Sequence, residues 1–277
     1  MLMHEYLGQR QKNAQVGVEI EMEGYDLPDH VVYWRVDDDG SLKSEENAEY
    51  VMDPPINIAR LDEVFDSLEK ALDDCGSEVN DTYRAGVHVH VNVQDLTPVQ
   101  FVNLVCIFFI LEELFIDYCA PSRKGNHFCL RARDAEYMIT LLRDAFETGN
   151  LKMLNTDDIR YSAMNVRSVF KHGTVEFRSH ESTRDFEKIK TWVRMLYKLH
   201  GAAQLYNNPK EIMADVSMGG YAGFVTKIMG EYAPWMLSQP NAQKKIREGI
   251  LHAQDLAFAR DWRKVNLNIF SKQQNIF

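Results

Sequence analysis

The sequence predicts an α+β fold in which an antiparallel sheet is followed by a helical tail. Segments with alternating apolar and polar residues, a pattern typical of strands, occupy residues 16–23, 31–36, 49–52, 87–93 and 174–180. All of them lie in the first two thirds of the chain, and the residues after about 200 have a helical pattern. In a doubly wound sheet strands and helices would alternate to the end, so the α+β class is favoured.

Helices are predicted from apolar stripes and from capping residues. Asn57 is a suitable cap for a helix over residues 58–74. Thr97 and Gln100 form a capping box, with Pro98 at the first helical position, for a strongly apolar helix that extends to about Phe115. A loop at 121–127 follows, and further helices are expected near 134–147 and 185–206, from Asn208–Pro209 onward, and near 241–260.

Composition and charge exclude several classes of protein. The 277 residues are 45% hydrophobic and 26% charged, as in an ordinary globular protein, and the net charge is −10. That charge argues against binding to bulk nucleic acid or to an anionic membrane. The most apolar stretch, residues 101–111, is shorter than the ~20 residues of a membrane span. The N-terminus has no apolar signal segment. We expect a soluble cytoplasmic protein with four reduced cysteines.

Three of the predicted strands carry related polar side chains on a single face. Residues two apart on a strand point the same way. The polar sets are Glu19, Glu21 and Glu23 on the first strand, His88, His90 and Asn92 on the second, and Glu176, Arg178 and His180 on the third. For any one strand, a solvated face of an antiparallel sheet is an adequate explanation. Together, however, these faces contain no lysine, and clustered carboxylates are unfavourable unless cations neutralise them. The pattern therefore predicts a shared divalent-metal site.

The residue types restrict the metal and suggest its ligand. Carboxylate oxygens favour Mg²⁺, and an imidazole among them is also compatible with Mn²⁺. Zinc is disfavoured because neither an H-E-x-x-H motif nor a cysteine ligand set occurs. Arg178 would suit a bound phosphate close to the metal. Neither of the common glycine-rich phosphate loops occurs, so a nucleotide would have to be held by metals and arginines on the sheet.

Six short motifs follow one another in the order of a known family. They are GVEIE (17–21), DGSL (39–42), EYVMDPP (49–55), GVHVHVN (86–92), RYSAMN (160–165) and TVEFRS (174–179). Together they resemble the amidoligase family, which belongs with glutamate–cysteine ligases to the carboxylate–amine ligases of glutamine synthetase-like fold. The resemblance covers residues 14–200. It implies a curved antiparallel sheet flanked by helices, a catalytic core over residues 1–200, and a helical C-terminal extension over 201–277 that packs on the core.

The resemblance also implies a metal-binding role for five residues. Glu19 and Glu21 match the paired strand glutamates that bind two different metal ions. His88 would share one ion with Glu19 and Glu176, and Glu49 would complete the coordination of the ion at Glu21. The metal would be Mg²⁺ or Mn²⁺, bound together with ATP.

Further residues are implied in nucleotide and substrate binding. Arg178 would face the β- and γ-phosphates, and Arg160, Tyr161 and Asn165 would contact substrate or phosphate, with Arg178, Arg160 and Asn165 as the catalytic set. His90 would lie nearer the nucleotide, and Arg123 and Asn126 would lie on a loop over the site. One position departs from the family, because relatives more often have a small hydroxyl residue in place of Asp53.

The implied reaction joins a carboxylate to an amine at the expense of ATP, through an acyl phosphate. The substrates would be small molecules or peptides, and the sequence identifies neither the acid nor the amine, nor the oligomeric state. Glu23, Asp39 and Glu45 are all candidates for the general base. Two alternatives stay open: a phosphotransferase to a guanidino or other nitrogen on the same broad fold, and a non-catalytic metal- or nucleotide-binding protein.

Overall fold

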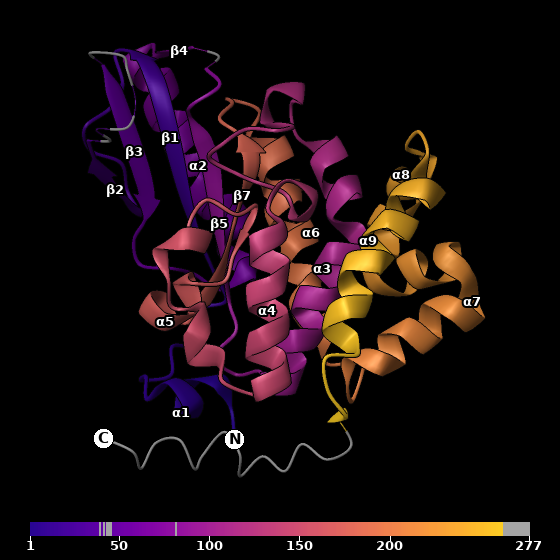
Figure 1. Cartoon of the computed structure of the whole chain (residues 1–277). Coiled ribbons are helices and arrows are strands. Elements are labelled where there is room, and N and C mark those ends of the chain that lie inside the picture. The colour runs from indigo at the N-terminus through magenta and orange to yellow at the C-terminus, as the bar shows by residue number, and fades with distance from the viewer. Residues whose placement is uncertain (39, 41, 43–45, 81, 263–277) are drawn as a thin grey trace.

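An open antiparallel sheet forms one side of the molecule (Figure 1). The computed structural model describes residues 1–38, 40, 42, 46–80 and 82–262. The strands lie in the order β2 (Trp34–Asp37), β3 (Asn47–Met52), β1 (Val16–Tyr25), β5 (Gly86–Asn92), β7 (Thr174–Glu181) and β6 (Met164–Asn165), and β4 (Glu78–Val79) pairs with the end of β1. The predicted α+β class is confirmed. The strand predicted at 31–36 begins only at Trp34, and the two-residue strands β4 and β6 were not predicted.

Helices make up the rest of the regular structure. They are α1 (Met3–Leu7), α2 (Leu61–Cys75), α3 (Pro98–Tyr118), α4 (Glu136–Thr148), α5 (Ser168–His172), α6 (Phe186–Ala203), α7 (Pro209–Met229), α8 (Ala233–Ser238) and α9 (Ala242–Ala257). Short 3₁₀ helices occupy Ile58–Arg60, Pro121–Arg123, Ala132–Asp134, Leu151–Leu154, Asp157–Ile159 and Gly230–Tyr232. The predicted capping box is confirmed: the Gln100 amide donates to the Thr97 hydroxyl at 3.2 Å, and the Thr97 amide donates to the Gln100 side chain at 2.8 Å.

The apolar face of the sheet forms the core with the central helices. Val18, Ile20, Val89 and similar residues on this face are buried, and the rings of Phe108 on α3 and Phe177 on β7 lie 5.2 Å apart. Helix α3 is long and apolar enough to cross a membrane, but 83% of its most apolar window is buried inside the protein. It is therefore a core helix, as its sequence predicted. Helix α9 covers α3, and α7 and α8 lie farther from the sheet (Figure 1).

A β-bulge in β7 changes which residues of that strand face the core. Val89 of β5 lies opposite Phe177, but Val87 lies opposite His180. One residue between these pairs on β5 therefore corresponds to two on β7. Such a bulge reverses the in–out alternation beyond it. His180 is fully buried, with its ring 5.6 Å from that of Trp192. The prediction that His180 shares the polar face with Glu176 is therefore wrong.

Candidate functional site

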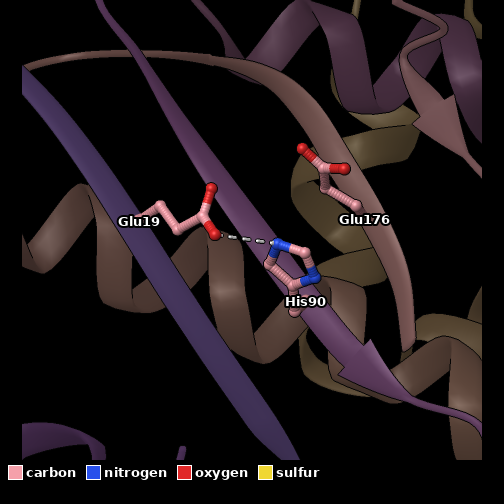
Figure 2. A group of neighbouring side chains, drawn as sticks. All are labelled: Glu19, His90 and Glu176. Atoms are coloured by element: carbon pink, nitrogen blue, oxygen red, sulfur yellow. Dashed lines mark ion pairs between the residues drawn. The ribbon is translucent and has the colours of Figure 1, made fainter. Parts of the chain in front are cut away.

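Cross-strand pairing brings the predicted polar residues together on one face of the sheet. Glu19 on β1 lies opposite His88 on β5, and His90 on β5 lies opposite Glu176 on β7. Glu21 lies opposite Glu49 of β3. All five residues predicted as metal ligands, together with His90, thus occupy four adjacent strands. Figure 2 shows Glu19, His90 and Glu176 converging from β1, β5 and β7.

The side chains in this cluster are close enough to share cations. His90 Nε2 lies 3.4 Å from Glu19 Oε1, and His88 Nδ1 lies 3.3 Å from Glu19 Oε2. His88 Nε2 lies 3.5 Å from Glu21 Oε1, and His88 Nδ1 lies 3.8 Å from Glu176 Oε1. Glu21, His88 and Glu176 are buried. Burying several carboxylates is unfavourable without compensating charge, so the cluster is suited to cation binding.

Two sets of side chains have ligand atoms within 4.8 Å of one another: Glu19, His90 and Glu176, and Glu19, Glu49 and His88. Glu19 belongs to both sets. The family resemblance placed His88 with Glu19 and Glu176, and it placed Glu49 with Glu21. These groupings stay predictions. The geometry adds His90 as a candidate ligand, and its predicted position near the nucleotide also stays a prediction. Glu21 is partly engaged elsewhere, because its Oε2 accepts a hydrogen bond of 2.8 Å from the Gly86 amide.

Charge coupling favours ionised carboxylates in the cluster. Burial acts to raise the pKa of Glu19, but hydrogen bonds from His88 and His90 outweigh it and lower that pKa far below its ordinary value. Burial likewise acts to raise the pKa of Glu176, but the charges of Arg178, His90 and His88 together outweigh it, so this pKa is also lowered. Ionised carboxylates are the form that binds a divalent metal.

A cavity of about 250 Å³, here called the arginine cavity, opens beside the cluster. The guanidinium groups of Arg84, Arg160 and Arg178 line it together with the carboxylates of Glu19, Glu21 and Glu49. Arg178 is paired with one cluster carboxylate, that of Glu176. Guanidinium groups beside candidate metal ligands can bind the oxygens of a phosphate.

Two aromatic rings support the arginines of this cavity. The guanidinium carbons of Arg160 and Arg178 lie 5.4 and 5.9 Å from the centre of the Tyr161 ring. Arg84 lies 5.8 Å from the centre of the Phe128 ring. Neither Arg84 nor Phe128 was predicted as a site residue, since neither lies on a predicted strand face or in a recognised motif. The position of Arg84 just before the GVHVHVN strand was the only feature of the sequence that could have indicated its place at the site.

Arg123 and Asn126 bind backbone carbonyl groups. Arg123 is only 1% exposed, and its Nη2 donates to the Arg178 carbonyl at 2.8 Å. Asn126 Nδ2 donates to the Tyr83 carbonyl at 2.8 Å. A Cβ at Gly86 would lie 3.0 Å from Arg123 Nη2, so the glycine makes room for the guanidinium. This geometry gives both residues a role in positioning the chain near the bulge, and the nucleotide contacts expected of them stay predictions.

The remaining predicted residues lie at the edges of the cluster. Asn165 is buried, and its Nδ2 donates to Glu176 Oε2 at 2.7 Å, which orients that carboxylate. Glu23 is buried on β1, two residues beyond Glu21. The other two candidates for the general base, Asp39 and Glu45, lie outside the described residues.

A second cavity of about 210 Å³, here called the Lys12 cavity, meets the first at Glu19. Its wall includes Lys12, Arg35, Asp53 and His172, together with His90 from one of the candidate metal-ligand sets. The two cavities therefore reach the same carboxylate from different sides of the candidate metal site.

A family model described as "Putative amidoligase enzyme" matches residues 30–200, which is more than half of the chain. The matched region contains Glu49, His88, Arg160, Glu176 and Arg178, whereas β1 with Glu19 and Glu21 precedes it. No curated protein matches the sequence.

Proposed function

Because the chain belongs to the amidoligase family, a family of ligase-type enzymes, we propose that it is an ATP- and Mg²⁺-dependent carbon–nitrogen ligase. It would join a carboxylate to an amine through an acyl phosphate. Its substrates would be small molecules or peptides in the cytoplasm. The observation that carries the proposal is the arginine cavity, in which three guanidinium groups face the same space as the carboxylates of the candidate metal site.

The residues present fit a hard divalent cation. Glu19 with His90 and Glu176, or Glu19 with Glu49 and His88, offers two carboxylates and one imidazole. This donor set suits Mg²⁺, and the imidazole makes it suitable for Mn²⁺ as well. When bound, the metal would reduce the electrostatic repulsion between the buried carboxylates and the phosphates of ATP.

The arginines would bind the phosphoryl group that is transferred. Negative charge spreads over the phosphoryl oxygens during transfer, and preorganised donors stabilise it. Arg160 and Arg178 are held against the Tyr161 ring, and Arg178 Nε also donates to the Phe128 carbonyl at 3.3 Å. These contacts limit the rotation of the guanidinium groups before any ligand binds. Arg84, which also lines the cavity, would be a third donor.

The reaction balances in two steps. A carboxylate oxygen of the acid attacks the γ-phosphorus, and ADP leaves. The amine nitrogen then attacks the acyl carbon, inorganic phosphate leaves, and the amine loses a proton to a base.

Hydroxylamine tests this proposal without knowledge of the natural amine. The full-length chain is incubated with ATP, Mg²⁺, hydroxylamine and sets of carboxylic acids, and hydroxamate, ADP and phosphate are measured. We expect the three products in equal amounts. With an ¹⁸O-labelled acid, one ¹⁸O should appear in the phosphate. The Glu176→Gln variant should lose the activity, and Glu69→Gln, a change of an exposed glutamate on α2, should retain it.

Two other outcomes would overturn the proposal. A stable N-phosphorylated product, detected by ³¹P NMR with guanidino compounds as acceptors, would identify a phosphotransferase. Calorimetry that shows no Mg²⁺-dependent binding of ATP would identify a non-catalytic protein.

A further inference from the structure

The Lys12 cavity lies where the acceptor of a phosphoryl group would have to enter. In phosphoryl transfer the attacking and leaving oxygens lie roughly in line, on opposite sides of the phosphorus. Under the proposed function the phosphates of ATP occupy the arginine cavity. The acceptor must then approach the shared residue Glu19 from the other side, which is the side of the Lys12 cavity.

The floor of this cavity is formed by a strand position without a side chain. Gly17 lies opposite His90 on β5, on the same face of β1 as Glu19. A Cβ at Gly17 would lie 3.7 Å from the Cβ atoms of both His90 and Pro55. The bare backbone therefore leaves open the space beside His90, and a longer side chain would fill it.

Several polar groups on the wall are already used inside the protein. Asn92 Nδ2 donates to the Ala14 carbonyl at 2.6 Å and to the Lys12 carbonyl at 3.1 Å. Gln15 Oε1 accepts from the Ile58 amide at 3.1 Å. Thr174 Oγ1 lies 2.8 Å from His90 Nδ1. These contacts shape the wall and leave its charged side chains as the main groups for recognising a ligand.

The available charge in the cavity is positive. Lys12 is exposed, and within the described parts of the chain its ammonium group has no hydrogen bond or ion pair. Arg35 is 54% exposed and binds Asp37 at 2.8 Å and Asp53 at 3.6 Å. Asp53 thus offsets Arg35 within the cavity, and Glu19, the other carboxylate of the lining, belongs to the metal-ligand cluster. Lys12 is therefore the cation that stays available for a ligand.

We propose that the Lys12 cavity admits the carboxylate substrate and that Lys12 and Arg35 select an acid with a second anionic group. The inference rests on the proposed function. One carboxylate of the acid would reach the metal-ligand cluster at Glu19, and the second would lie between Lys12 and Arg35. At about 210 Å³ the cavity is smaller than the roughly 300–1,000 Å³ pockets of drug-sized ligands. It therefore suits a small dicarboxylate or the acidic end of a longer molecule.

Binding of simple acids tests the inference without turnover. Succinate, glutarate and adipate are compared with butyrate and pentanoate by saturation-transfer NMR and calorimetry, using the full chain with Mg²⁺ and a non-hydrolysable ATP analogue. We expect at least one dicarboxylate to bind about tenfold more tightly than its monocarboxylate partner. Lys12→Gln and Arg35→Gln should each weaken dicarboxylate binding about threefold to fivefold, as expected for one exposed charge pair. Arg35→Lys should restore part of the loss, and the preference should fall at high salt.

Lys171 provides the matched control, because it is an exposed lysine next to His172 that does not line the cavity. Lys171→Gln should bind the acids as the natural chain does. Equal binding of mono- and dicarboxylates, or a dicarboxylate preference that survives Lys12→Gln, would overturn the inference. Tighter binding of a simple amine such as ethylamine, lost in Asp53→Ser, would overturn it by assigning the cavity to the amine.

The same titration separates this inference from the proposed function. If the nucleotide analogue binds and hydroxamate forms but no dicarboxylate preference is found, only the inference fails. If no nucleotide binds but the preference depends on Lys12, the assignment of the cavity as a dicarboxylate site stands and the ligase proposal fails.

Discussion

His90 Nε2 lies 3.4 Å from Glu19 Oε1, and Glu19 is the carboxylate that both candidate metal-ligand sets share. The same residue separates the arginine cavity from the Lys12 cavity. A change at Glu19 should therefore affect metal binding more than a change at a residue that belongs to one set only.

The first prediction concerns the loss of this shared carboxylate. Glu19→Ala should lower the affinity for Mn²⁺ by at least ~10-fold, since even indirect partners of metal ligands commonly contribute ~10–100-fold. Electron paramagnetic resonance of free Mn²⁺ measures the change. Glu49→Ala should remove one set of ligands and leave the other, so a smaller loss is expected. Glu69→Ala is the control, and a Glu19→Ala variant that binds Mn²⁺ normally would contradict the assignment.

Arg160 is the best arginine for a test of phosphate binding. Its side chain is exposed and packs on Tyr161, with its guanidinium 5.4 Å from the ring centre. Such a contact at an exposed site is worth only about 0.5–1 kcal/mol. Arg160→Ala should therefore unfold at nearly the same urea concentration as the natural chain, while hydroxamate formation falls by ~10²–10³-fold. Arg143→Ala on α4 should be fully active. An Arg160→Ala variant with unchanged turnover would exclude this residue from the transition state.

Strand periodicity predicted the polar face because it fixes the side on which each residue lies. Glu19, His88 and Glu176 were grouped in this way, and antiparallel pairing of β1, β5 and β7 brings them together. The α+β class followed from the same alternation. Periodicity could not indicate which carboxylate meets which imidazole, since that depends on strand register and on side-chain rotamers. The structure places His90 beside Glu19 and Glu176, and the position nearer the nucleotide that the family resemblance implied stays a prediction.

Features that depend on irregular backbone could not be predicted. The bulge in β7 has no marker such as glycine, and it moves His180 from the polar face into the core. The family resemblance implied a nucleotide contact for Arg123, which stays a prediction, but it could not indicate that the guanidinium donates to three carbonyl groups of the protein. Side chains in a loop do not alternate regularly in direction as they do along a strand. Their directions therefore depend on tertiary contacts.

The burial of His180 predicts a specific loss of stability in acid. Burial lowers the pKa of His180 from 6.5 to about 4. Above pH 6.5 the imidazole is neutral in both states. Between pH 6.5 and about 4 the unfolded chain binds a proton that the folded chain excludes, so stability falls with falling pH and this contribution stops near pH 4. The total loss should be about 3 kcal/mol.

Urea unfolding of His180→Phe at several values between pH 7 and pH 4 measures this contribution. The variant should lose less stability across the interval than the natural chain, whatever its stability at pH 7. Replacement of the exposed His30 by Asn should leave the loss of stability between pH 7 and pH 4 unchanged. Equal slopes for His180→Phe and the natural chain would show that His180 accepts a proton in the folded state.

The last prediction tests how α9 is held against the core. Gly249 of α9 faces the backbone of α3, and a Cβ at this position would lie 2.3 Å from the Phe109 carbonyl oxygen and 2.6 Å from that of Ile110. Backbone atoms cannot move aside as a flexible side chain can, so Gly249→Ala must push the two helices apart. Overpacking of this kind typically costs about 1–3 kcal/mol.

Gly223 of α7 offers a matched substitution, because a Cβ there would meet no atom within 4 Å. Alanine is favoured over glycine inside a helix by about 0.5–1 kcal/mol, so Gly223→Ala should stabilise the chain slightly while Gly249→Ala destabilises it. Urea unfolding of both variants measures whether each substitution raises or lowers the free energy of unfolding. If the residues after about 200 form an extension that packs on the core, Gly249→Ala should lower the unfolding midpoint of the whole chain in one transition. A separate early transition for α9, with the rest unaffected, would show that the extension contributes little to the stability of the core.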